Sequence, residues 1–177
     1  MKERVPAGRI AAYGLLLALS LVLSYVEMLI PFTFGIPGAK LGLANLTTMT
    51  ALYALGGRQA LWIGLLRILL WGFTFGSPFT MLYSVCGFGL SLAGMVLLKK
   101  TGAFGITGVS AAGGVLHNLG QLICAAVLVK SPYVFTYFPA LFAAGTAAGI
   151  LIGLLGGKLV NRLQRPMQRL MDRSRIS

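Results

Sequence analysis

Apolar runs long enough to cross a lipid bilayer dominate this sequence and limit the folds open to it. We place six of them near residues 9–30, 41–56, 59–76, 79–98, 108–130 and 134–158, of which the second and third are the shortest. A helix needs about 20 residues to cross a hydrocarbon core of ~30 Å. With 57% hydrophobic and only 10% charged residues, the chain lies outside the composition of soluble domains. The sequence therefore predicts an all-α, polytopic membrane protein with six transmembrane helices.

The distribution of basic residues predicts how these spans are oriented. If the N-terminus is cytoplasmic, Lys40 and Lys130 face outward and Arg67 lies within the membrane. The cytoplasmic side then carries Lys2, Arg4, Arg9, Arg58, Lys99, Lys100, Lys158, Arg162, Arg165, Arg169, Arg173 and Arg175. This asymmetry obeys the positive-inside rule with an even number of spans, so both termini should be cytoplasmic. The net charge of +12 is explained by topology and anionic lipid, and we expect no nucleic-acid partner.

Residues 1–160 are expected to form a single six-helix transmembrane domain, followed by a basic cytoplasmic tail over residues 161–177. The first run lacks a small-residue cleavage site, so we expect it to stay as a span. The segment from Lys158 to Arg175 is typical of an amphipathic helix interrupted at Pro166. It could rest on the lipid surface or bind a cytoplasmic partner.

Small residues recur at helical spacing in three runs and predict close helix contacts. They are Gly145, Gly149, Gly153 and Gly157 in the last run, Ser84, Gly87, Ser91 and Gly94 in the fourth, and Ala7, Ala11, Gly14 and Ala18 in the first. Each set could pack against another helix of this chain. The set in the first run could equally receive a helix of another subunit.

Polar residues inside the runs are few, and Arg67 is the most informative of them. Counting ~1.5 Å per residue from the cytoplasmic ends, Arg67 and His117 both lie about 13 Å deep. Asn118 and Gln121 extend a polar edge along the helix of His117. A charge at that depth needs a partner, water or a ligand, so these four residues predict a shared polar cavity. A purely structural hydrogen-bond network is the alternative.

Glu27 and the connection after the first run lie toward the outer side. Glu27 could pair with Lys40 or help to hold Arg67, or it could couple to protons. Residues 31–45 combine prolines, glycines and apolar side chains, which predicts an ordered cap with Lys40 and Asn45 at its mouth. A tight loop with an interfacial lysine is the alternative reading.

Catalytic and metal-binding patterns are scarce. Glu3, Glu27 and Asp172 are the only acidic residues, too few for the aspartate-rich clusters that hold Mg²⁺ in prenyl transfer. Cys86 and Cys124 lie in apolar runs without companion ligands, so neither a metal site nor a disulfide is expected. There is no GxxxxGK[ST] phosphate loop. The sequence predicts that this chain is not an enzyme, holds no metal and binds no cofactor directly.

Three segments carry a resemblance to a known family. They are residues 37–45 (PGAKLGLAN), the stretch from Arg67 to Gly72 with the following Ser77-Pro78-Phe79, and residues 117–121 (HNLGQ). They resemble the Gx transporter family, often labelled heptaprenyl diphosphate synthase component I, over roughly residues 10 to 160. That family in turn looks like the S components of energy-coupling factor (ECF) transporters, which bind substrate in six-helix bundles of the bacterial plasma membrane.

The resemblance implies roles for particular residues. Lys40 and Asn45 would belong to a capping loop, and Arg67, His117, Asn118 and Gln121 would line the substrate pocket. The small-residue face of the first helix would dock to a transmembrane coupling protein served by two ATPases, which would hydrolyse ATP. The first run departs from the usual Ala-xxx-Ala coupling motif, offering Ala7, Ala11, Gly14 and Ala18 instead.

Two functions follow as expectations. The preferred one is a substrate-binding membrane subunit for uptake of a small anionic or polar metabolite. The other is a non-transporting membrane partner in isoprenoid-quinone synthesis or in flavin-linked extracellular electron transfer, with a flavin or lipid headgroup in the cavity.

Overall fold

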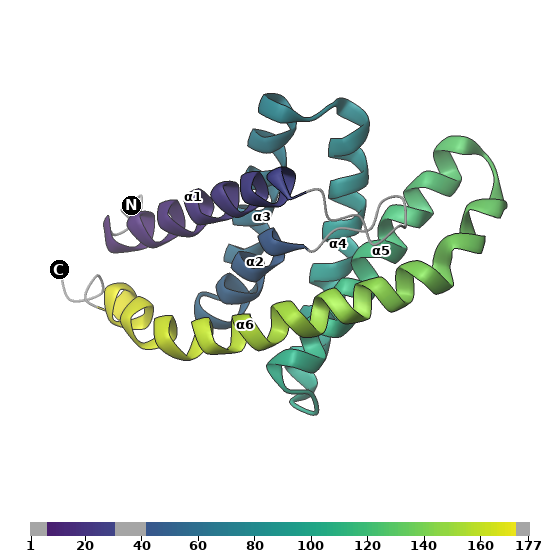
Figure 1. Ribbon diagram of the computed structural model, residues 1–177. Coiled ribbons are helices and arrows are strands. Elements are labelled where there is room, and N and C mark those ends of the chain that lie inside the picture. The colour runs from purple at the N-terminus through teal and green to yellow at the C-terminus, as the bar shows by residue number, and fades with distance from the viewer. Residues whose placement is uncertain (1–6, 31–41, 173–177) are drawn as a thin grey trace, which may run out of the picture.

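Six α-helices and one short 3₁₀ helix make up the part of the chain that the structure describes, a computed structural model of residues 7–30 and 42–172, with side chains to residue 163 (Figure 1). The helices are α1 (Ala7–Leu29), α2 (Leu43–Ala54), α3 (Gly57–Phe75), α4 (Pro78–Thr101), α5 (Ile106–Val129), η1 (Pro132–Tyr137) and α6 (Phe138–Asp172). These described residues form no strand. The predicted all-α fold is therefore confirmed.

Helix α2 is the core element, because α1, α3 and α6 all pack around it. Most of its residues are buried, including three consecutive threonine and methionine positions, Thr48, Met49 and Thr50. A buried hydroxyl needs a partner, and the Thr50 hydroxyl finds one by donating to the Leu46 carbonyl at 2.8 Å within the same helix. At its end, Lys99 of α4 donates to the Leu52 carbonyl at 2.7 Å and so satisfies a terminal acceptor.

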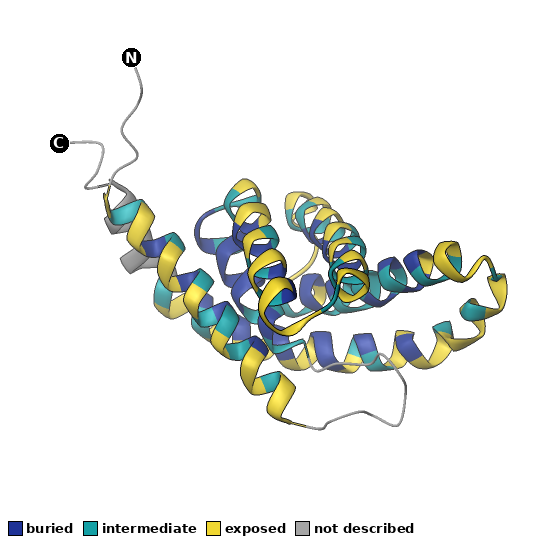
Figure 2. Cartoon of the chain, turned by 90° about the horizontal axis from the view of Figure 1, so that it is seen from above, coloured by how far each residue is buried: buried dark blue, intermediate teal, exposed yellow. Residues whose placement is uncertain are grey.

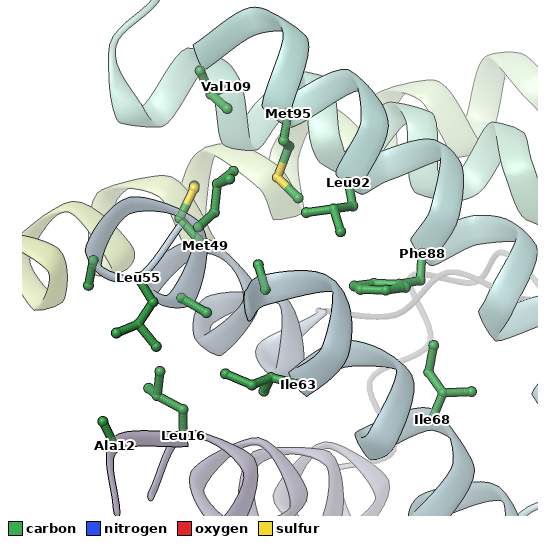
Figure 3. Packing of buried hydrophobic residues seen from close by; sticks show 14 residues of the cluster. Ala12, Leu16, Met49, Leu55, Ile63, Ile68, Phe88, Leu92, Met95 and Val109 are labelled. Carbon is green, nitrogen blue, oxygen red and sulfur yellow. The ribbon is translucent and has the colours of Figure 1, made fainter. Parts of the chain in front are cut away.

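Apolar side chains from five helices meet around α2. Figure 3 shows Leu16 of α1, Ile63 of α3 and Phe88 of α4 among the labelled side chains of this core, together with Met49 of α2. Val109 extends the cluster to α5. Figure 2 shows that the outward helix faces are mostly exposed. In a bilayer these exposed apolar faces would meet lipid.

The small residues of α6 bring its backbone against α5. A Cβ added at Gly149 would lie 2.6 Å from both the Ala111 Cα and the Ser110 carbonyl oxygen, and one at Gly153 would lie 2.7 Å from the Thr107 Cα. Only glycine permits such an approach. Gly157 is looser, with its nearest neighbour at 3.9 Å. The prediction that α6 packs through its small residues on another helix of this chain is confirmed.

The small residues of α4 contact α5 in the same way. The Ser91 hydroxyl donates to the Gly113 carbonyl at 2.8 Å across the two helices. A Cβ at Gly87 would lie 2.9 Å from the His117 carbonyl oxygen. Helix α5 is therefore held between α4 and α6, and this places its polar edge in the interior of the bundle.

The small-residue face of α1 differs, because nothing in the described chain covers it. Ala7, Ala11, Gly14 and Ala18 are all exposed, and a Cβ added at Gly14 would meet no atom within 4 Å. The prediction left open whether this face packs internally or receives another subunit. The structure shows that it does not pack internally among the described residues.

Four helical segments are long and apolar enough to cross a membrane. They are Ala7–Leu29, Pro78–Thr101, Ile106–Val129 and Pro132–Leu163. Helix α2, with 12 residues, spans only about 18 Å at 1.5 Å per residue. Helix α3 has 19 residues, including Arg58 and Arg67. Crossing by α2 and α3 therefore stays a prediction, although six α-helices occur close to the predicted positions.

Helix α6 corrects one expectation. It is a single helix of 35 residues that continues through Pro166, so the predicted interruption there is wrong. Proline removes one backbone donor, and the flanking turns nonetheless keep helical geometry. The start of α1 and the end of α6 lie at the same end of the molecule (Figure 1), in keeping with an even number of crossings. Which side of a membrane they face stays a prediction.

The contact between α5 and α6 can be tested by adding one methyl group. Gly149→Ala should lower the thermal unfolding midpoint, since overpacking against backbone costs about 1–3 kcal/mol. The matched variant Gly14→Ala enters open space and should hold or raise the midpoint, because alanine favours helices by up to about 1 kcal/mol over glycine. Equal midpoints for the two variants in detergent would contradict the close approach of α6 to α5.

Candidate functional site

A cavity of about 520 Å³ lies inside the bundle, and all six α-helices contribute to its wall. Its size falls within the range of small-molecule sites, about 300–1,000 Å³. Five residues predicted to bind substrate line it: Asn45 of α2, Arg67 of α3, and His117, Asn118 and Gln121 of α5. The sixth, Lys40, lies outside the described residues. The predicted convergence of Arg67 with the polar edge of α5 is thus present, while a binding role for these residues stays a prediction.

Arg67 is the only cationic side chain in the described wall of this cavity. Its Nε atom is fully buried and has no hydrogen-bond partner. Among the described residues, no carboxylate forms an ion pair with the guanidinium. Glu27 is the acidic residue whose field acts on it, from a longer distance. The cavity therefore contains a guanidinium whose Nε–H donor has no partner in the structure.

Glu27 is engaged elsewhere, at the start of α2. Its carboxylate accepts the Gly42 backbone N–H at 2.6 Å. Gly42 adopts the left-handed conformation, with φ of 73°, which glycine reaches without strain and which turns the chain into α2. A carboxylate at a helix N-terminus is favoured by the helix dipole. Glu27 thus links α1 to α2, and its predicted pairing with Lys40 falls outside the described residues.

The three polar residues of α5 have different surroundings. The Asn118 amide nitrogen donates to the Leu141 carbonyl of α6 at 2.7 Å in a buried position. A buried amide satisfied in this way holds two helices together, as the structural alternative proposed. His117 and Gln121 lie beside Gly87, where an added Cβ would meet the Gln121 Cγ at 2.8 Å. Glycine at position 87 therefore leaves room for these two side chains at the cavity wall.

Hydroxyl groups form a part of the wall that the sequence analysis missed. They belong to Ser24 of α1, Thr80, Ser84 and Ser91 of α4, and Ser110 of α5. The Ser24 hydroxyl is buried without a hydrogen-bond partner in the structure. Its spacing of three residues from Glu27 was a signal, because residues three apart share a helix face. The cavity wall therefore contains the unpartnered Ser24 hydroxyl as well as the Arg67 guanidinium.

Aromatic side chains at the end of α3 were also missed. Trp71 and Phe75 line the cavity, and their ring centroids lie 4.7 Å apart. Tyr25 of α1 approaches the Phe75 ring at 5.9 Å. Trp71 follows Arg67 by four residues and so lies on the same face of α3, a spacing that could have indicated it. Helix α3 thus presents a cation and two aromatic rings to one cavity.

In the described residues, no group of three His, Cys, Asp or Glu side chains could hold a metal ion. Cys86 and Cys124 are free thiols on α4 and α5, outside the cavity wall.

Comparisons with known proteins bear on the family. No curated protein and no solved structure matches the chain. Over residues 16–159, the sequence matches the family described as heptaprenyl diphosphate synthase component I, in agreement with the resemblance seen in the motifs. The further likeness to S components of ECF transporters stays a prediction. Because the match extends over most of its length, this chain belongs to the heptaprenyl diphosphate synthase component I family.

Proposed function

We propose that this chain is a non-catalytic, ligand-binding subunit of a membrane complex, and that its cavity receives the anionic part of a ligand. The observation that carries the proposal is the Arg67 side chain, which lines the cavity and whose buried Nε atom has no hydrogen-bond partner in the structure. Its five N–H donors match the oxygens of a carboxylate or phosphate in a planar, two-point contact.

The free energy of burial supports this reading. A charged group taken out of water without a partner costs several kcal/mol. Glu27 reduces that cost through its field, but its carboxylate already accepts the Gly42 N–H. An anion bound at Arg67 would remove the remaining cost. Two further donors at the wall, the Ser24 hydroxyl and the Gln121 amide, would complete the contacts of its oxygens.

The family description supports a role beside prenyl diphosphate chemistry. It names a synthase component, which implies a second component, and a prenyl diphosphate carries the kind of anion that Arg67 fits. With three acidic residues in the whole sequence, the chain cannot build the aspartate clusters of a diphosphate-cleaving site. We therefore assign the reaction to a soluble or membrane partner, and binding or presentation of the ligand to this chain.

A second candidate function is uptake of an anionic metabolite, energised by a separate coupling protein and ATPases. One observation favours it: the exposed face of Ala7, Ala11, Gly14 and Ala18 on α1. Faces of small residues allow close helix association in membranes, so a transmembrane partner could dock there. Both candidates share the cavity and differ in the partner.

Arg67→Gln tests the binding role. Native mass spectrometry of the protein released from its host membrane should show a bound anionic molecule in the wild type and lose it in this variant. Arg58→Gln makes the same change on the same helix at an exposed position outside the cavity, and should keep the bound molecule. Equal occupancy in all three proteins would remove Arg67 from the binding site.

The stability of the Arg67→Gln variant distinguishes an arginine that binds a ligand from one that holds the fold. In ligand-free protein, Arg67→Gln should leave the unfolding midpoint unchanged or raise it, because it removes an unpaired buried charge. Asn118→Ala should lower the midpoint, since it removes a buried hydrogen bond between α5 and α6, which typically contributes about 0.5–1.5 kcal/mol. A large loss of stability in Arg67→Gln would mean that Arg67 holds the fold.

Purification from the host discriminates between the two partners. The role proposed first, beside prenyl diphosphate chemistry, predicts a stoichiometric complex with a prenyl-transfer protein and prenyl transfer only in that complex. If proteoliposomes containing the chain, a coupling protein and ATPases instead accumulate an anionic solute with ATP, and no prenyl-transfer protein co-purifies, uptake replaces that role.

A further inference from the structure

A second hollow adjoins the cavity, on the outer surface between α1 and α3. It is a groove of about 420 Å³. Helix α1 contributes Leu21, Val22 and Tyr25 to its lining, and α3 contributes Leu70, Trp71, Thr74 and Phe75. None of these side chains is charged. The groove is thus an apolar channel on a face that would meet lipid in a membrane.

The hydroxyl that α3 contributes to the groove is satisfied within its own helix. The Thr74 hydroxyl donates to the Leu70 carbonyl at 2.8 Å, so it offers no unmet donor to an occupant. The aliphatic side chains Val22 and Leu70 are 57% and 45% exposed, so they leave open apolar surface along both walls. Apolar surface of this kind is best covered by hydrocarbon.

The groove and the polar cavity share two residues. Trp71 and Phe75 belong to the lining of both hollows, so the two hollows meet at these residues. Arg67 precedes Trp71 by one turn on α3, and Thr74 lies about 10 Å farther along the helix than Arg67 at ~1.5 Å per residue. One extended molecule could therefore contact the guanidinium with one end and the groove with the other.

We infer that the ligand of this chain is an anionic amphiphile, whose headgroup binds at Arg67 and whose hydrocarbon chain passes Trp71 and Phe75 into the groove between α1 and α3. This inference rests on the proposed function and adds the place where the hydrocarbon chain of the ligand binds. The guanidinium in the cavity, with its unpartnered Nε, and the uncharged groove that shares Trp71 and Phe75 with the cavity match the two ends of such a molecule. The chain would enter sideways from the bilayer, without crossing water.

Binding in nanodiscs of phosphatidylcholine tests this inference with matched probes. Radiolabelled farnesyl diphosphate carries both ends, inorganic diphosphate carries only the head, and farnesol carries only the chain. The complete probe should bind at least tenfold more tightly than either part, and the Arg67→Gln variant should lose it. Phosphatidic acid, added as competitor, reports whether a bulk anionic lipid can serve as the source of the same chemistry.

The outcomes separate the two proposals. If inorganic diphosphate binds as tightly as farnesyl diphosphate and its binding depends on Arg67, the anion site is supported and an amphiphilic ligand is excluded. If no probe binds in an Arg67-dependent manner, both the anion site and the amphiphile are overturned. If phosphatidic acid at equal concentration displaces farnesyl diphosphate, the ligand is still an amphiphile, and its source is a membrane lipid.

A groove-filling variant tests the path of the chain. Val22→Trp should weaken farnesyl diphosphate binding at least tenfold while binding of inorganic diphosphate stays unchanged. Val127→Trp makes the same change at an exposed valine of α5 that lines neither hollow. It should leave the binding of both probes unchanged. Unfolding midpoints show that each variant is folded. Undiminished farnesyl diphosphate binding in folded Val22→Trp would overturn the placement of the chain in the groove.

Discussion

The burial of one guanidinium charge inside a bundle of apolar helices is the constraint around which the rest of this molecule is arranged. Arg67 lies on α3 in the wall of a cavity to which every α-helix contributes. Its charge is stabilised at a distance by Glu27, and Glu27 is held in place by the Gly42 N–H at the start of α2. The hydrogen bond from the Gly42 N–H to Glu27 therefore serves both the fold and the electrostatics of the cavity.

Small residues make this cavity possible. Gly145 and Gly149 of α6 meet Gly114 and Ala111 of α5 at backbone distance, so the two helices are joined without large side chains. The same three glycines also line the cavity. A bundle joined by leucine side chains would fill this space, whereas contact through glycine leaves it open to small hydroxyls and to a ligand. Helix association and the hollow thus have one common cause.

Much of this could be predicted from the sequence, because apolar length, charge and spacing report burial directly. The depth count brought Arg67 and His117 together, and the four-residue spacing of glycines predicted the contact made by α6. The acceptor of Asn118 could not be predicted, since it is the backbone carbonyl of Leu141, to which side-chain patterns give no clue. Continuation of α6 through Pro166 depends on the flanking turns rather than on proline itself. Ser24 and Trp71 were missed because single polar or aromatic residues in apolar runs usually pack without a ligand.

The central claim is that the partner of the Arg67 guanidinium is a bound anion. The most direct measurement is an experimental structure of the protein in nanodiscs, prepared with the molecules it carries from its host. We expect density of a bound anion within hydrogen-bonding distance of the guanidinium, about 2.7–2.9 Å. A guanidinium paired only with protein carboxylate or carbonyl oxygens, in an otherwise water-filled cavity, would contradict it.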